Sequence, residues 1–501
     1  MMLSWRNAAI EYCVYQKTDC CPLDGIDVTN VMNLTAQLSP YLQKTEHSFG
    51  HVLVGRKLAR RKLSGLKLLE RTSHSSPLLL GVALSASLLT APAFATTELA
   101  LQLATSLTSD SNPLRFYDGD AAAAQNGNTS TSDKVKALDV RAGAIIPILS
   151  DRTRLILTGS LGTRQYQTYQ DLDHQEKAGD ASFEYAIGNI LTGRVTAGKE
   201  DRLFQYINGS LTAKDISHFS QTGAELTLKI TDELSVPVKL DRSNLHYDLD
   251  VNQLYNFHQN GQQAGLKYYS PTGSNLELGV RFSDTDYPNR NPQQIADLDQ
   301  RYRETETYIE AEWKYSVKTA VSTHLGLIRR RYDSLSDLNT NLVSTLVRGT
   351  YFYSPKLRLD AQIFDRPFAI VDPSILYVVT KGLRLDAQWN MSDKTQFHLM
   401  GLAQNSDQKL VPRLAEIQDS VSRKEKLTRA GFGINYQLQR GVRLMLDSFY
   451  EKVERDANLP GLKQGVIMIG LEYSYENFPG STAKMGLSRY QHSLNNTDAL
   501  R

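Results

Sequence analysis

The sequence predicts an all-β protein, a transmembrane antiparallel up-and-down β-barrel of about 18 strands, with 16 strands as the alternative. Three observations predict this class. A secretory leader precedes the main part of the chain, apolar and polar residues alternate over many short segments, and the connections between these segments are alternately short and long. The alternation alone also fits a soluble, exported all-β protein, because sheets with one buried face show it too.

The leader ends at Ala95. Its uncharged apolar run, residues 77–90, follows a basic stretch and precedes Ala93-Phe94-Ala95, the small-x-small pattern of a signal-peptidase site. The alternative, an uncleaved membrane anchor, would need about 20 apolar residues. We therefore expect cleavage after Ala95. The predicted parts are an N-terminal extension plus signal peptide (1–95), the barrel (96–478) and a C-terminal tail (479–501).

Composition excludes several classes of protein. The three cysteines, Cys13, Cys20 and Cys21, all precede residue 96, so the mature chain cannot contain a disulfide or a cysteine-ligated metal. The full chain has 56 Lys and Arg against 54 Asp and Glu. Because this balance leaves no strongly basic stripe, we expect no nucleic-acid partner.

The alternation is clearest in SNLELGVRFSDTDYPNR, residues 274–290, where Leu276, Leu278 and Val280 are separated by polar residues or glycine. The hexapeptide LRLDAQ occurs twice, at 357–362 and 383–388, and VRLMLD occurs at 442–447. Alternate side chains of a strand point to opposite faces, so we expect the apolar side chains to face lipid and the polar ones to face the lumen. The candidate pore-lining residues are Glu277, Arg281, Arg358, Asp360, Arg384, Asp386, Arg443 and Asp447.

Strands of about 10 residues can be placed along the whole of the predicted barrel. The predicted strands are 98–107, 135–147, 154–167, 180–187, 190–200, 219–230, 235–247, 260–269, 275–285, 302–315, 320–331, 341–353, 357–367, 375–390, 395–404, 427–437, 442–452 and 464–475.

The connections between these strands fall into two kinds. The short ones include residues 150–153, 231–234, 270–274, 316–319, 354–356, 391–394 and 438–441. The long polar ones include residues 108–133, 284–301, 332–340, 404–425 and 452–463. Short turns at one end and long loops at the other are typical of outer-membrane barrels.

Aromatic residues stand next to many of the short turns. Such rings at one height form a girdle at a membrane interface; the candidates are Tyr268, Tyr269, Trp313, Tyr315, Tyr351, Tyr353, Trp389 and Tyr436. Near the chain end, Gly470, Tyr473 and Tyr475 have the pattern of a final barrel strand. That pattern resembles the signal that the outer-membrane assembly machinery recognises, although a tail follows it in place of a terminal aromatic residue.

Two segments carry a resemblance to a known family. SDSNPLR (109–115) and FSDTDYPNR (282–290), followed by Asp299 and Tyr302, together with the spacing of the SPT and SPK turns, resemble the EpsL-type outer-membrane β-barrel porins. These porins are encoded with exopolysaccharide biosynthesis genes, often in exosortase-containing clusters. The resemblance implies an outer-membrane channel or accessory protein that supports exopolysaccharide export. It provides no catalytic residues.

Other functions remain open. A general small-solute porin is the main alternative, and a barrel enzyme that acts on lipid or glycan is a third. No GxSxG, HExxH or phosphate-binding glycine-rich motif occurs in residues 96–501, so we expect no enzyme activity, cofactor or metal. The RRR cluster at 329–331 fits either a solvated charge run or an attraction for anionic sugars or lipopolysaccharide phosphates.

The expected location is the outer membrane of a Gram-negative bacterium. The expected partners are outer-membrane lipid and lipopolysaccharide. A secreted polysaccharide and its export machinery are further candidate partners.

Overall fold

The computed structural model describes residues 97–117, 131–150, 152–204, 213–368, 374–411, 422–456 and 460–487. The predicted leader, with Ala93 and Ala95, lies outside the described residues, as does the end of the tail. The described chain forms 18 strands: β1 (Glu98–Asp110), β2 (Asp133–Ser150), β3 (Thr153–Tyr166), β4 (His174–Ile187), β5 (Leu191–Leu203), β6 (Ile216–Lys229), β7 (Leu234–Tyr247), β8 (Phe257–Tyr269), β9 (Asn275–Asp286), β10 (Arg301–Ser316), β11 (Thr319–Tyr332), β12 (Thr340–Ser354), β13 (Leu357–Phe368), β14 (Ile375–Asn390), β15 (Thr395–Leu410), β16 (Ser422–Gln439), β17 (Val442–Arg455) and β18 (Leu462–Glu476).

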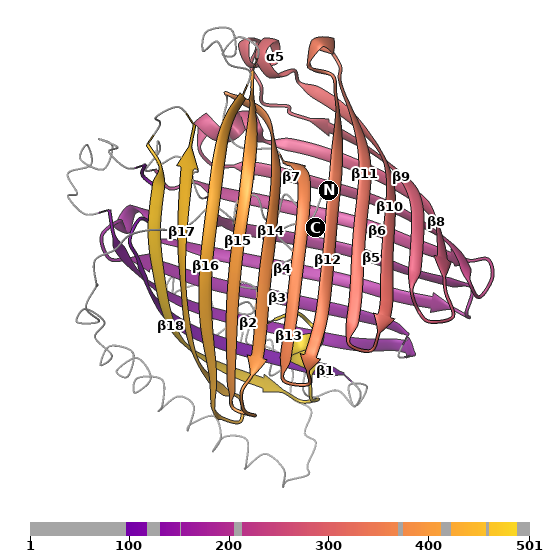
Figure 1. Ribbon diagram of the computed structural model, residues 1–501, viewed down its shortest axis with the longest axis vertical. Coiled ribbons are helices and arrows are strands. Elements are labelled where there is room, and N and C mark those ends of the chain that lie inside the picture. Colours follow the sequence, from indigo (N-terminus) through magenta and orange to yellow (C-terminus); the bar gives the residue numbers. More distant parts are fainter. Residues whose placement is uncertain are drawn as a thin grey trace, which may run out of the picture. The chain divides into compact units, whose positions relative to one another are not determined.

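Each strand pairs with its neighbours in sequence, and the sheet closes on itself (Figure 1). Closure occurs between β1 and β18, which pair antiparallel from Ala100 opposite Glu476 to Asp110 opposite Val466. A closed sheet leaves no edge with unpaired backbone groups, which the membrane interior could not hydrate. The predicted fold class, an antiparallel up-and-down barrel with 18 strands, is confirmed.

Each predicted strand corresponds to one observed strand, and the observed strands are longer except β3 and β14, which have the predicted length. The largest difference is the predicted loop 404–425, because β15 continues to Leu410 and β16 begins at Ser422. From Gln404 to Lys409 the residues on both faces are polar. Apolar alternation therefore marks only the part of a strand that faces lipid, and the hairpin extends past it.

The connections segregate to the two ends of the barrel. Short turns join β2–β3, β4–β5, β6–β7, β8–β9, β10–β11, β12–β13, β14–β15 and β16–β17, and the chain enters β1 and leaves β18 at this same end. By the usual orientation of such barrels this end faces the periplasm. The β4–β5 turn, absent from the predicted turns, uses Gly188 at a φ of 57°, where a residue without Cβ is unstrained.

The longer loops lie at the other, extracellular end. They contain the helix α5 (Pro292–Leu298), labelled at the upper end of the barrel in Figure 1, and the 3₁₀ turns η2 (Gln170–Leu172), η3 (Asp250–Tyr255) and η4 (Ser336–Leu338). A last helix, α7 (Ser481–Lys484), follows β18. No helix in the described ranges is long and apolar enough to cross a membrane.

The two faces of the sheet are inverted relative to a soluble protein. Leu278 and Ile363 are 51% and 57% exposed on the outer face, whereas the adjacent Glu277 and Gln362 are 5% and 2% exposed on the inner face. Burying polar groups while leaving large apolar ones exposed is unfavourable in water. The arrangement is favourable when lipid surrounds the barrel, so the chain is a membrane-spanning barrel of the outer-membrane type.

Leu385 on β14 offers a test of this orientation, because it is 52% exposed on the outer face. Leu385→Arg should lower the free energy of unfolding in lipid vesicles by about 2–4 kcal/mol, the cost of a cation near the bilayer midplane. Urea titration followed by tryptophan fluorescence measures the change. Lys381→Arg, further up the same strand, is the control. A cost below about 0.5 kcal/mol for Leu385→Arg, the usual range for a water-exposed site, would contradict a lipid-facing position.

Candidate functional site

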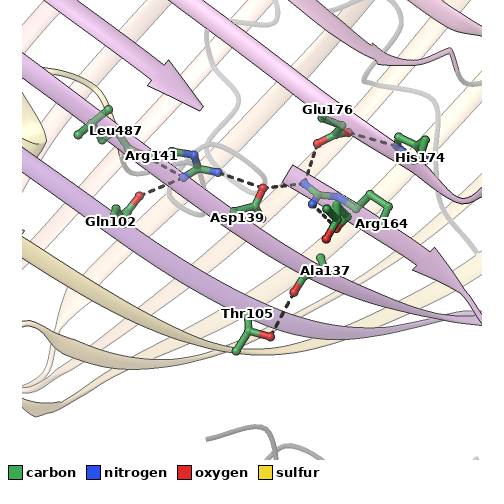
Figure 2. A network of polar contacts seen from close by, with 10 residues as sticks. Gln102, Thr105, Ala137, Asp139, Arg141, Arg164, His174, Glu176 and Leu487 are labelled. Atoms are coloured by element: carbon green, nitrogen blue, oxygen red, sulfur yellow. Dashed lines mark hydrogen bonds and ion pairs between the residues drawn. The ribbon is translucent and has the colours of Figure 1, made fainter. Parts of the chain in front are cut away.

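The candidate functional site is the inner wall of the barrel. On β1 to β4, inward side chains form a continuous polar network in which bases and acids alternate (Figure 2). Arg164 Nη2 lies 3.0 Å from Asp139 Oδ1 and 2.7 Å from Glu176 Oε2. Arg141 Nη1 donates to Gln102 Oε1 at 3.0 Å, and its Nη2 lies 3.9 Å from Asp139. The wall is therefore polar but locally neutral.

Similar pairs recur around the wall. Arg281 donates two hydrogen bonds of 3.0 Å to the carboxylate of Asp241, and Arg330 Nε donates to Glu304 Oε1 at 2.9 Å. A buried charge is tolerated only when a counter-charge and hydrogen bonds replace its water. Among the residues described by the structure, no group of three or more His, Cys, Asp or Glu could hold a metal ion.

The eight predicted pore-lining residues all occupy inward positions, but the structure does not gather them into one site. Four of them form two ion pairs, each between residues two positions apart on the same strand. Arg358 pairs with Asp360 and Arg384 pairs with Asp386, each with a nitrogen-to-oxygen distance of 2.8 Å. The others find different partners. Glu277 accepts a hydrogen bond from Tyr308 at 2.7 Å, Arg281 pairs with Asp241, Arg443 pairs with Glu472, and Asp447 lies opposite Gly433.

The segment that follows β1 folds into the lumen. Leu114, Phe116 and Tyr117 are buried, and Arg115 is only 2% exposed. The Arg115 guanidinium lies 3.7 Å from the fully buried carboxylate of Glu451 on the inner face of β17. Arg455, also on β17, stacks on the Tyr117 ring at 3.9 Å. Residues 111–117 therefore narrow the lumen beside β17.

Asn112 gives this inserted segment its shape. Its side-chain amide donates to the Phe116 carbonyl at 2.8 Å and accepts from the Phe116 N–H at 2.9 Å. Both hydrogen bonds lie within the segment and close its turn, whereas the Ser111 N–H at the start of the segment donates to the Gly465 carbonyl of β18 at 3.0 Å. Asn112 and Arg115 both belong to SDSNPLR, the first segment of the family resemblance.

The residues after β18 also turn into the lumen, at the periplasmic end. Met485 and Leu487 pack on Ala100 and Ile145, inward residues of β1 and β2. Arg141 donates to the Leu487 carbonyl at 2.8 Å (Figure 2). Residues 479–487 of the predicted tail are thus part of the lumen wall.

This tail has further attachments to the beginning of β1. Glu98 accepts hydrogen bonds from Ser481 at 2.8 Å and from Lys484 at 2.6 Å. The wall makes room for the tail at Gly143, where a Cβ would lie 2.5 Å from the Met485 sulfur. A larger side chain at position 143 would force the Met485 side chain to move.

Aspartates tie the extracellular loops to one another. Asp133, the first residue of β2, accepts the N–H groups of Gln167, Thr168 and Tyr169 in the next loop. Asp299, before β10, accepts those of Ser334 and Leu335. Burial opposes ionisation of Asp299, but its backbone donors outweigh burial and hold its pKa below the usual range.

The second segment of the resemblance also closes a loop. In DTDYPNR, Arg290 stacks on Tyr287 at 3.7 Å and donates to the Leu298 carbonyl at 2.9 Å. The RRR cluster is divided between the faces. Arg330 is buried inside with Glu304 and lies over the Tyr302 ring at 4.5 Å, whereas residues 329 and 331 point outward.

The predicted interface aromatics are all exposed near the periplasmic end. Seven of them, Tyr268, Trp313, Tyr315, Tyr351, Tyr353, Trp389 and Tyr436, fit a girdle on the outer face. Tyr269 is the exception, because adjacent residues of a strand point to opposite faces, and its ring lies 5.7 Å from the ammonium of the inward Lys267.

The predicted assembly signal falls on the last strand. Gly470 is inward, where a Cβ would lie 3.0 Å from Met445 Cε. Tyr473 and Tyr475 take the outward positions of β18, which is the strand that closes the barrel against β1. Whether the assembly machinery reads these residues stays a prediction.

Sequence reasoning missed the two segments that enter the lumen. The available signals were the apolar residues Leu114, Phe116 and Tyr117 inside a loop expected to be polar, and Met485 and Leu487 inside a tail. Neither run is long enough to form a strand. Glu451 was also missed, although it is a fully buried acid.

No protein-family model and no curated protein matches the chain. Solved structures do match. OccAB3 of Acinetobacter baumannii is 10% identical over 76% of this chain and 100% of its own, with a TM-score of 0.41. Pseudomonas aeruginosa OccK9 is 10% identical over 76% of this chain and 99% of its own, with a TM-score of 0.44. The outer membrane protein opdK of the same organism is 9% identical over 75% of this chain and 99% of its own, with a TM-score of 0.43. Similarity this distant carries no functional argument.

Arg115→Ala should release the inserted segment and raise single-channel conductance in planar bilayers, because the segment would lose its charged contact with β17. We also expect the free energy of unfolding to fall by about 1–3 kcal/mol, since a buried charge loses a partner. Arg303→Ala, an outer-face substitution, should leave conductance unchanged. An Arg115→Ala channel with wild-type conductance would show that the segment does not restrict the lumen.

Met485→Ser with Leu487→Ser should detach the tail, because each substitution removes an apolar contact worth roughly 1.5–3 kcal/mol. Trypsin should then cut after Lys484 much faster, as measured by mass spectrometry of the intact barrel, and conductance should rise. Phe478→Ser, at an exposed position, is the matched control. Equal cleavage in both variants would contradict a docked tail.

Proposed function

We propose that the protein is a channel of the Gram-negative outer membrane that supports export of an exopolysaccharide. The observation that carries this proposal is the inverted sheet, whose polar face lines the inside of all 18 strands. A hydrated wall of this kind suits a hydrophilic solute. The choice of an exopolysaccharide comes from the resemblance to EpsL-type porins.

The form of the lumen bears on what could pass through it. Residues 111–117 occupy space beside β17, and residues 479–487 occupy space beside β1 and β2. Both restrict the cross-section, which favours a single extended polymer chain or a small solute over a folded protein. The paired charges of the wall favour neither anions nor cations strongly.

A small-solute porin is the second candidate, favoured by the same restriction of the lumen. No observation favours a barrel enzyme in the same way. The polar residues of the described wall are distributed around it in pairs and are not gathered into one cluster. The proposed partners are outer-membrane lipid and lipopolysaccharide on the outer face, and the secreted polysaccharide with its export machinery at the two mouths.

A deletion strain distinguishes these functions. We expect loss of the gene to reduce polysaccharide in the medium, with complementation by the wild-type gene restoring it. Accumulation of polymer in the periplasm indicates a conduit, whereas loss of polymer without accumulation indicates an accessory role. Normal secretion together with slower uptake of small hydrophilic solutes would contradict the export function and favour the porin.

A further inference from the structure

The extracellular ends of β14 and β15 reach across the mouth of the barrel. Val411, which follows β15, is 1% exposed and belongs to an apolar cluster whose other members come from the far side of the barrel: Phe204, Tyr247, Leu254, Tyr255 and Leu298. In the closed sheet of 18 strands, β15 lies diametrically opposite β6, between the strands that carry Phe204 and Tyr247. The packing of Val411 therefore spans the mouth.

Leu376, near the start of β14, takes part in the same packing. It lies against the cluster that contains Val411 and against a second apolar cluster of the far side, formed by Phe219, Phe257, Tyr287, Tyr302, Tyr332 and Leu338. Leu245 of β7 also packs on both clusters and so joins them. We define the crossing contact as the packing of Leu376 and Val411 on these two clusters.

A β-bulge directs the end of β14 away from the barrel wall. The pairing of β14 with β15 shifts register between Ile375 and Tyr377, so Leu376 is an extra residue on β14 without a partner in the ladder. A bulge bends the strand that contains it and changes the direction of its side chains. This accounts for the position of Leu376 over the mouth, although the rest of β14 follows the wall.

The two sides of the crossing contact are held in different ways. On the far side, Asp215 accepts hydrogen bonds from the Leu249 N–H at 2.9 Å and from the Asn252 side chain at 2.7 Å, which fixes the loop that carries Leu254. The side chains of Leu376 and Val411 have no hydrogen-bonding group. Apolar packing is non-directional, so these two side chains can leave the far side without breaking a hydrogen bond of their own.

We propose that the crossing contact is a gate at the extracellular mouth, closed in this structure and opened when the ends of β14 and β15 move away from the far side. The closed gate places apolar side chains in the path of a hydrophilic solute or polymer and offers it no hydrogen-bond partners. This inference rests on the proposed channel function. It is separate from the narrowing by residues 111–117 and 479–487, which lie against other strands.

The first test measures opening of the contact by thiol labelling. Residues 96–501 contain no cysteine, so Val411→Cys provides the one thiol of a full-length chain in which Cys13, Cys20 and Cys21 are replaced by serine. A polar maleimide reaches this thiol when the contact opens. Val251→Cys, at a 54% exposed position of an extracellular loop, gives the labelling rate of an open site. We expect Val411→Cys to react much more slowly.

A substitution on the far side should open the contact without altering β14 or β15. With Leu254→Ser, we expect labelling of Val411→Cys to be at least about tenfold faster, because an apolar side chain buried only in the closed state is lost. Leu172→Ser is the matched control. Leu172 is also a buried leucine of an extracellular 3₁₀ turn, but it packs on Leu114 and Phe116 and should leave the labelling rate unchanged.

The second test measures conductance in planar bilayers. Val411→Ser should raise the ratio of open to closed time at least about tenfold, for the same reason. Leu410→Ser is the control, because Leu410 is buried against Ile375 and Val378 within its own hairpin and should leave this ratio unchanged. Heat-dependent gel mobility verifies that each variant forms a closed barrel.

Three results would overturn the gate. They are labelling of Val411→Cys as fast as that of Val251→Cys, equal acceleration by Leu254→Ser and Leu172→Ser, and a ratio of open to closed time that Val411→Ser leaves unchanged. Labelling does not require conduction, so it tests the opening of the contact even if the barrel conducts no ions. Failure of the gate is thereby distinguished from failure of the channel function.

Discussion

The absence of water in the membrane interior is the constraint on which this structure depends. Every backbone N–H and C=O within the bilayer must find a partner in the chain, so the sheet has to close. Closure through β1 and β18 joins the first and last strands of the barrel, and the inverted faces follow from it. Leu278 is exposed and Glu277 is buried because the solvent outside is lipid and the polar space is inside.

A closed polar interior then creates a second requirement, since charges with little access to water need partners. The wall meets it with acid–base pairs. Of the inserted segments, 111–117 adds a further pair, Arg115 with Glu451, whereas 479–487 offers the Leu487 carbonyl as an acceptor to Arg141. At the extracellular end, carboxylates satisfy loop backbone groups. One arrangement occurs twice. Asp133 accepts loop N–H groups, and the side chain of Asp173 accepts the Tyr166 N–H. At the same sequence spacing, Asp299 accepts loop N–H groups, and the side chain of Asn339 accepts the Tyr332 N–H.

The strand count, the order of the strands and the two faces could be predicted from the sequence, because the period of two is imposed locally on every lipid-facing segment. The ends of the strands could not. Between Gln404 and Lys409 both faces are in water or in the polar lumen, and the apolar signal vanishes while the hairpin continues. Pore-facing residues such as Arg384 and Asp386 could be assigned to the inner face, because alternate residues of a strand point to the same side. Their partners could not, because pairs such as Arg115 with Glu451 join residues far apart in the sequence.

The residues that restrict passage are therefore of a different kind from those that build the wall. The strands fix the diameter of the barrel, but the free cross-section depends on residues 111–117 and 479–487, which follow no strand periodicity and are attached by a few specific contacts. Gly143 illustrates the close fit, since a Cβ at this position would force the Met485 side chain of the tail to move. Two barrels with the same 18 strands could thus differ in what they transport through changes confined to these attachments. In this chain the segment SDSNPLR, which carries part of the family resemblance, overlaps the inserted residues 111–117. The resemblance therefore falls on a part of the molecule that narrows the lumen.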